Sequence, residues 1–214
     1  MALSTYTELK AALADWLHRT DLTSQIVDFI DLAEVEINSE IRTRQMQVDE
    51  TLSLTSGTKT VALPSRYIDP ISLELVIAGE NNTPLFYVSP QNISSNTATS
   101  SRPVFWTING DNIEFEYLAD QTYSLSFRML KGYDLAATET NDLLTKYPGL
   151  YLFGALLQAA PYMVDDQRIG TWQNSYDKAL SKAKKVEGRN SRLVTLRTEF
   201  PLSGASRNSN IITG

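Results

Sequence analysis

The residues that could carry acid–base or metal chemistry are few. The chain of 214 residues holds one histidine, His18, and no cysteine. Thiolate metal sites, iron–sulfur clusters, cysteine nucleophiles and sites built on two imidazoles are therefore excluded. His18 is predicted to end the first helix, where a capping or packing role accounts for it. Neither a Gly-x-Ser-x-Gly turn nor a glycine-rich phosphate loop occurs.

Pairs of carboxylates are the remaining candidates for catalysis, because two of them can serve as acid and base in glycoside hydrolysis. The closest pairs are Asp31 with Glu34, Glu114 with Glu116, and Asp165 with Asp166. The second pair shares one face of a predicted strand, and the third straddles a helix junction. Solvated faces and a helix cap explain all three pairs, so the sequence favours a binding or assembly protein that is not an enzyme and needs no metal or cofactor.

Charge is divided unevenly along the chain. Residues 1–180 carry twelve Lys/Arg and 23 Asp/Glu, whereas residues 181–214 carry seven and two, and the net charge is −6. An acidic body argues against a general nucleic-acid binder, which needs cations to displace counterions from phosphates. The basic end has two interpretations. It can dock on an acidic partner, or Lys182, Lys184 and Lys185 can complement a helix dipole.

Two amphipathic helices are predicted at the N-terminal end. The capping box Thr5-x-x-Glu8 begins one that ends at His18, and no secretory leader is expected before it. A second helix starts near Thr23 or Ser24, runs for about 20 residues, and places a core stripe on one side. That stripe comprises Ile26, Ile30, Ala33, Ile37 and Ile41. Val35 lies on the opposite, polar side, either as a subunit contact or as an ordinary exposed valine.

A β region follows, where the apolar period becomes two. Residues 51–55 and 58–63 are predicted to form a hairpin around Ser56-Gly57, and 71–77 a further strand. Asn109-Gly110 predicts a hairpin of 104–108 with 113–117. Residues 123–130 form the last strand, and the Asn/Ser/Thr-rich run 91–101 is expected to be a loop.

Helices return near the C-terminal end. After Pro148 the sequence is apolar on every side, which indicates a buried helix, and Pro161 should kink or end it. At about 15 residues, 150–164 is too short to cross a bilayer. A last helix carries Ile169, Trp172, Tyr176, Ala179 or Leu180, Ala183 and Val186 on one stripe and is predicted to end near Gly188. Beyond it, Val194, Leu196, Thr198 and Phe200 alternate like a strand that could join another protein's sheet.

The predicted fold is therefore α+β: a helical bundle of N- and C-terminal helices with an inserted antiparallel β meander and an extended C-terminal tail. The corresponding segments are 1–47, 48–132, 133–189 and 190–214. The β region also holds several of the ten tyrosines and three tryptophans, among them Tyr87, Tyr117, Tyr123 and Trp106. They suit either interface anchors or core packing.

Several stretches resemble the head-to-tail adaptor (head completion) proteins of short-tailed bacteriophages. The N-terminal matches are Tyr6-Thr7-Glu8-Leu9, Ala14-Asp15-Trp16-Leu17, Asp21-Leu22, Phe29-Ile30-Asp31-Leu32-Ala33-Glu34 and Ile41-Arg42-Thr43-Arg44-Gln45-Met46. The C-terminal matches are Tyr147-Pro148, Tyr151-Leu152-Phe153-Gly154-Ala155-Leu156-Leu157, Ala159-Ala160-Pro161-Tyr162, Asp165-Asp166, and Trp172 with Tyr176 and Ala179-Leu180.

The resemblance implies a ring of identical subunits, usually twelve, attached beneath the portal protein and presenting a surface to a tail nozzle or other next tail component. It implies no catalytic residues, a virion location with assembly in the host cytoplasm, no membrane, and DNA that passes through the lumen without specific binding. On this interpretation the basic end docks on the portal, with Arg192 and Arg197 meeting acidic groups and Val194, Leu196 and Phe200 as apolar anchors. Val35 would contact a neighbouring subunit. A tail-tube gatekeeper ring or, as another class, a hydrolytic tail enzyme are the alternatives.

Overall fold

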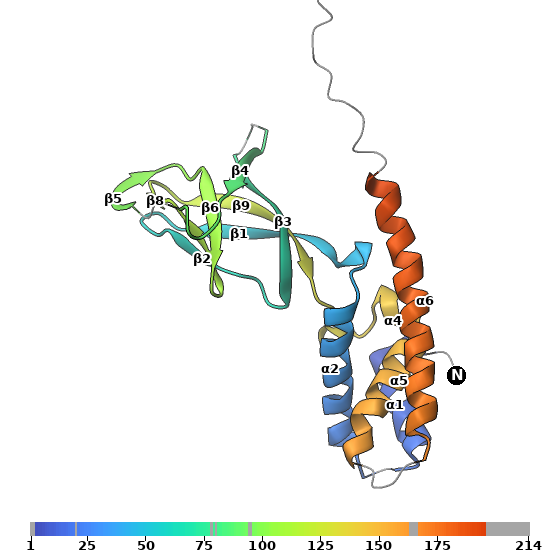
Figure 1. The fold of residues 1–214 in the computed structure, drawn as a ribbon. Coiled ribbons are helices and arrows are strands. Elements are labelled where there is room, and N and C mark those ends of the chain that lie inside the picture. Colours follow the sequence, from blue (N-terminus) through green and yellow to red (C-terminus); the bar gives the residue numbers. More distant parts are fainter. Residues whose placement is uncertain are drawn as a thin grey trace, which may run out of the picture.

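The structure is a computed structural model with a helical region and a β region (Figure 1). It describes residues 3–19, 21–77, 79, 81–93, 96–162 and 167–195, with only the backbone described for 96–98 and 188–195. Strand pairing is predominantly antiparallel, so the predicted α+β class is confirmed.

Six helices and two short 3-10 turns occur within the described residues. They are α1 (Tyr6–Leu17), α2 (Thr23–Glu40), η1 (Arg44–Met46), α3 (Leu135–Thr138), α4 (Asp142–Lys146), α5 (Pro148–Ala159), η2 (Ala160–Tyr162) and α6 (Ile169–Thr195). The predicted capping box at Thr5 is present, and His18 ends α1 in the left-handed conformation at φ 52°. Pro148 opens α5 as predicted, and the 3-10 turn η2 ends it at Pro161.

One hydrophobic core holds these helices together. It contains the whole predicted stripe of α2, together with Leu9 and Leu13 of α1, Leu150 and Tyr151 of α5, and Trp172 and Tyr176 of α6. Gly154 lets α5 approach its neighbours closely. A Cβ there would lie 3.2 Å from the Tyr176 ring and 3.3 Å from Ala33 Cβ, which is tighter than ordinary packing allows.

The strands form a seven-stranded sheet with the order β1-β9-β3-β4-β6-β7-β2 and a separate pair, β5 with β8. Their bounds are β1 (Gln47–Leu54), β2 (Thr60–Ala62), β3 (Tyr67–Val76), β4 (Thr83–Tyr87), β5 (Asn96–Ser101), β6 (Phe105–Asn109), β7 (Asn112–Phe115), β8 (Tyr117–Ala119) and β9 (Tyr123–Lys131). A second hydrophobic core, which includes Trp106, Phe115 and Phe127, lies within this region.

The β6–β7 hairpin forms as predicted, with Gly110 at φ 57° in its turn. Two other predictions for this region are wrong. Residues 51–63 form no hairpin, because β1 pairs with β9 along its whole length and β2 pairs with β7. Residues 96–101 are not loop but form β5, which pairs parallel to β8. Asn, Ser and Thr side chains bury little, but their backbones still hydrogen-bond to a neighbouring strand.

The last helix is longer than predicted. α6 continues through Gly188 to Thr195, seven residues beyond the expected end. A glycine inside a helix costs about 1 kcal/mol relative to alanine and does not by itself stop the helix. The predicted stripe also shifts near its end, because Glu187 is buried while Val186 is 38% exposed. Arg192 and Val194 are consequently helical rather than extended.

Candidate assembly surfaces

A buried polar cluster joins the helical region to the β region. Its centre is Glu34 of α2, whose side chain is completely buried. The hydroxyl of Tyr151 donates a 2.8 Å hydrogen bond to Glu34 Oε1, and the amide N–H of Leu135 donates another at 3.0 Å. The amide of Asn141 in turn donates to the Tyr151 hydroxyl at 2.8 Å. The carboxylate therefore binds α2 to α5 and to the first residue of α3.

Arg66 reaches this cluster from the loop that precedes β3. Its Nη1 donates to Glu34 Oε2 at 3.3 Å and to the carbonyl oxygen of Tyr133 at 3.1 Å, and its Nε donates to Asp134 Oδ2 at 3.0 Å. The carbonyl oxygen of Arg66 itself accepts from Gly132 N–H at 2.8 Å. Because Arg66 belongs to the β region and Glu34 to the helical region, these hydrogen bonds link the two regions.

The electrostatics of the cluster are dominated by burial. Burial raises the pKa of the Glu34 carboxyl, and the hydrogen bonds from Tyr151 and Leu135 and the charge of Arg66 oppose that rise. Burial also raises the pKa of Tyr151, which stays a neutral donor to the carboxylate. Burial raises the pKa of Tyr133, which shares a 2.6 Å hydrogen bond with Thr43, to about 12. The cluster is thus a structural joint.

In each of the two predicted carboxylate pairs that lie within the described residues, one carboxylate is held by structural partners. Glu34 is buried and bound as described, so its interpretation as part of a solvated face is wrong. Glu114 pairs with Lys59 at 2.7 Å and accepts a hydrogen bond from Asn109 at 2.9 Å. Asp165 and Asp166 lie outside the described residues. Within the described part of the chain, no three His, Cys, Asp or Glu side chains are grouped so that they could hold a metal ion.

The outer side of α2 exposes large apolar side chains. Val35 is 63% exposed and Leu32, one turn earlier, is 53% exposed. Val35 therefore lies off the helical core, as its predicted role requires, although its contact with another subunit stays a prediction. Asp28, one turn before Leu32, is exposed as well. An apolar pair beside a carboxylate on a helix surface can serve as a protein contact.

A second exposed apolar group lies on β4 and β6. The rings of Phe86 and Phe105 are tilted by 44° with their centroids 6.2 Å apart. Their side chains are 58% and 39% exposed, and Tyr87 is 54% exposed. Other predicted anchors pack inside: Trp106 and Tyr123 are buried, and Tyr117 is half-buried. Of the predicted aromatic anchors, exposed Tyr87 therefore suits an interface, whereas buried Trp106 and Tyr123 belong to the core.

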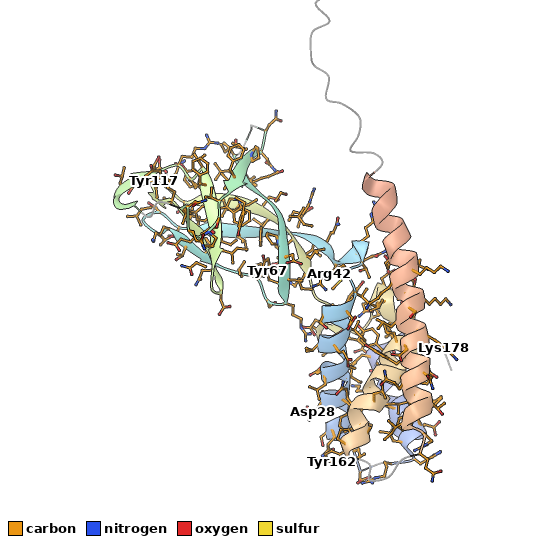
Figure 2. All side chains as sticks on the ribbon, viewed as in Figure 1. Asp28, Arg42, Tyr67, Tyr117, Tyr162 and Lys178 are labelled. Atoms are coloured by element: carbon orange, nitrogen blue, oxygen red, sulfur yellow. The ribbon has the colours of Figure 1, made fainter. Side chains whose placement is uncertain are left out.

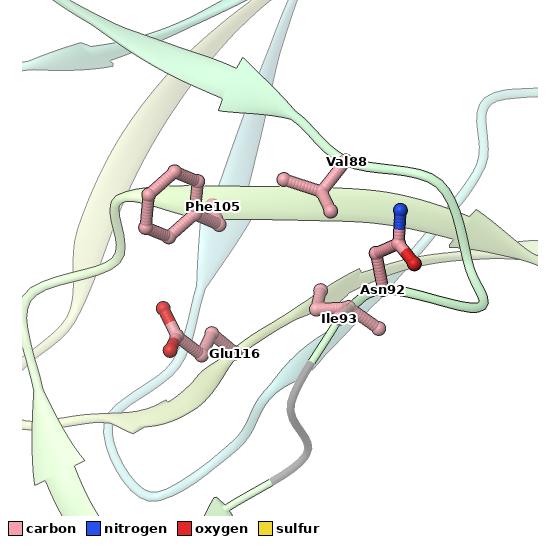
Figure 3. A pocket seen from close by; sticks show the side chains of 5 residues that line it. All are labelled: Val88, Asn92, Ile93, Phe105 and Glu116. Atoms are coloured by element: carbon pink, nitrogen blue, oxygen red, sulfur yellow. The ribbon is translucent and has the colours of Figure 1, made fainter.

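A small pocket adjoins these rings (Figure 3). Its volume is about 250 Å³, and its described lining consists of Val88, Asn92, Ile93, Phe105 and Glu116. Sites for small molecules are usually larger and have several convergent polar groups. This pocket offers one carboxylate and one amide, so we assign it no cofactor.

The proposed docking residues are only partly covered by the structure. Arg192 and Val194 lie in α6, while Leu196, Arg197 and Phe200 fall outside the described residues. The last described buried side chain on α6 is Glu187.

Among the described helices, none combines the length and apolarity that a membrane crossing demands.

The arrangement of two regions around one buried joint, with exposed apolar faces, agrees with the resemblance to head-to-tail adaptors. The family model for the SU10 adaptor protein matches residues 4–198. The chain belongs to this adaptor family. The match spans both regions, and it identifies the chain as a phage structural adaptor. A search of curated proteins finds no match to the chain.

Proposed function

We propose that this adaptor forms a homo-oligomeric ring, of about twelve copies as the phage resemblance implies, which joins the portal protein to the next tail component and encloses part of the DNA conduit. The match to the adaptor family over residues 4–198 is the observation that carries this proposal. An acidic body suits a conduit, because like charge keeps DNA from adhering to the wall. The ring is assembled in the host cytoplasm and remains in the virion.

Each region has a separate task in this proposal. The helical region acts as a bundle that builds the ring, and Val35 on the outer side of α2 contacts the neighbouring subunit. The β region presents the exposed rings of Phe86, Tyr87 and Phe105 to the tail nozzle or other tail component. The joint at Glu34 and Arg66 holds these two surfaces in a fixed relation.

The C-terminal end docks on the portal. Arg192 and Arg197 meet acidic groups, while Val194 at the end of α6 and Leu196 and Phe200 beyond it supply apolar anchors. Residues 181–214 hold seven Lys/Arg and only two Asp/Glu, and this excess of positive charge supports an acidic partner.

Truncation tests this docking. A chain that ends at Gly188 keeps the described buried side chains of α6, so we expect an unchanged thermal midpoint and loss of binding to purified portal rings. The full chain with Arg192→Ala and Arg197→Ala isolates the charge contribution, and should bind more weakly, with the largest loss at low salt, where the charges are least screened. Unchanged binding of the truncated chain would place the attachment elsewhere on the molecule.

A further inference from the structure

The α2 outer face, which we define as Asp28, Asp31, Leu32 and Val35, is acidic and apolar. Leu32 and Val35 are more than half exposed, Asp28 is exposed and Asp31 is half-buried. Asp28 forms no ion pair with any residue in the described part of the chain. This face is therefore available to a partner that offers cations and some apolar cover.

The α6 outer face, which we define as Lys178, Lys182 and Lys185, has the opposite charge. All three side chains are exposed, and their spacing of three and four residues places them on one stripe. Lys184, by contrast, pairs with Glu40 at the end of α2 and marks the side of α6 that faces its own subunit. Lys178 and Lys182 form no ion pair within the described residues.

These two faces lie on opposite sides of the helical region. In Figure 2, Asp28 lies at the outer edge of α2 and Lys178 at the opposite edge, on α6. Two different, complementary surfaces on opposite sides of one chain cannot satisfy each other within that chain. Between copies they give a head-to-tail contact, which closes into a ring when the rotation between neighbours divides a full turn.

Val35 of the α2 outer face and Lys178 of the α6 outer face also lie at matching heights. α2 and α6 both run from the end farthest from the β region toward it, and Lys184 of α6 meets Glu40 of α2 (Figure 1). Val35 precedes Glu40 by five residues and Lys178 precedes Lys184 by six, so they lie about 7.5 Å and 9 Å below that contact at ~1.5 Å per residue. Neighbours at equal height around an axis along these helices would bring Lys178 opposite Val35.

We propose that the α2 outer face of one copy binds the α6 outer face of the next copy. The aliphatic stems of Lys178 and Lys182 cover Leu32 and Val35, and the Lys178 ammonium group meets the carboxylate of Asp31, which lies ~4.5 Å below Lys178 along the helix axes at ~1.5 Å per residue. This inference rests on the proposed ring and specifies its subunit contact as heterologous, α2 against α6.

Cysteine cross-linking of the full chain tests the direction of this contact, because the chain has no cysteine of its own. The variant carrying both Val35→Cys and Lys178→Cys, oxidised at high concentration, should give a ladder of trimers and larger species. Val35→Cys alone should give no product beyond a dimer. Lys178→Cys combined with Asp111→Cys, in the exposed turn of the β6–β7 hairpin, is the matched control and should give no ladder.

Charge reversal tests the chemistry of the same contact. Asp31→Lys and Lys178→Glu should each weaken self-association of the full chain by roughly tenfold or more, because like charges then face each other. Since every copy carries both faces, the doubly reversed chain should recover most of the lost association. If each single change weakens self-association and the double variant does not recover it, the pairing of these two faces is wrong.

The failures of this inference and of the proposed function are distinguishable. Two results would overturn the inferred contact and leave the adaptor function unaffected. One is a ring on the portal with no cross-link between α2 and α6. The other is a larger yield of cross-linked dimers from Val35→Cys alone than from the double variant. A chain that neither self-associates nor binds portal rings overturns both.

Discussion

The hydroxyl of Tyr151 on α5 donates a 2.8 Å hydrogen bond to the completely buried carboxylate of Glu34 on α2. These residues are 117 positions apart in the chain, on either side of the whole β region. Arg66 brings the β region to the same carboxylate. One acidic side chain therefore sets both the packing of the helices and the position of the inserted sheet.

Removing the Tyr151 hydroxyl should destabilise the protein. In Tyr151→Phe the Glu34 carboxylate loses a donor and Asn141 loses an acceptor, and an unsatisfied buried polar group costs about 1–3 kcal/mol. Urea unfolding followed by circular dichroism measures the change. Tyr87→Phe, on an exposed side chain, is the control and should change the free energy of unfolding by less than ~0.5 kcal/mol. Equal stability of the two variants would contradict the role of this hydrogen bond.

The free energy of unfolding should depend on pH through the titration of the Glu34 carboxyl. Because its pKa is raised in the folded protein, the native state holds its proton more tightly than the unfolded chain. Its contribution to stability is therefore full below about 4.5, the value of an unfolded glutamate, and is lost as pH rises through the higher folded pKa. The free energy of unfolding of the native protein relative to Glu34→Gln should fall as pH rises above about 4.5.

Glu8 provides a control of opposite sign. Hydrogen bonds from Ser4 lower the pKa of its carboxyl. Its contribution is present above the unfolded pKa and is lost as pH falls through the lower folded pKa. The stability of the native protein relative to Glu8→Gln should therefore rise with pH in the acid range. A difference curve for Glu34→Gln that also rises with pH would show that burial does not control the Glu34 carboxyl.

Loss of Arg66 should loosen the two regions from each other while leaving each core intact. Arg66→Ala removes the donors to Glu34, Tyr133 and Asp134 together. Spin labels on cysteines introduced at Asp111 and Lys178 should report a broader distance distribution by double electron–electron resonance. Arg128→Ala removes an exposed arginine pair with Asp49 away from the joint and is the matched control. An unbroadened distribution in Arg66→Ala would mean that the chain connections alone orient the sheet.

Substitution of Val35 should separate folding from assembly. Because the side chain is 63% exposed, Val35→Asp should change the free energy of unfolding of the monomer by less than ~0.5 kcal/mol. Ring formation should fail, as analytical ultracentrifugation or electron microscopy would show. Ile37→Asp, two residues later in the core, should instead unfold the chain. Rings that form normally with Val35→Asp would move the subunit contact away from the α2 outer face.

The helices were predictable because their determinants are local. The Thr5/Glu8 capping box, Pro148 at the start of α5 and the apolar stripe of α2 are all found within single helices. The burial of Glu34 could not be predicted in the same way, since its partners Leu135 and Tyr151 are more than 100 residues away. The helical spacing of the sequence places Glu34 beside the polar side of α2 and does not distinguish it from the exposed acidic residues there.

Strand pairing was predicted only where its cause was local. Gly110, at positive φ in the two-residue turn Gly110-Asp111, closes the β6–β7 hairpin, whereas Ser56-Gly57 lies between strands whose partners, β9 and β7, are far along the chain. Pairing at such distance depends on the sheet as a whole rather than on turn residues. The assembly faces follow the same division: Val35 stood out by its position in the pattern, while its partnership with α6 required the relative placement of two helices.

Electron cryomicroscopy of the assembled phage particle tests the adaptor proposal most directly. We expect a ring of copies of this chain immediately beneath the portal, with the helical regions side by side and the β regions directed to the next tail component. Density for this chain at the far end of the tail, or as isolated copies that form no ring around the DNA path, would contradict it.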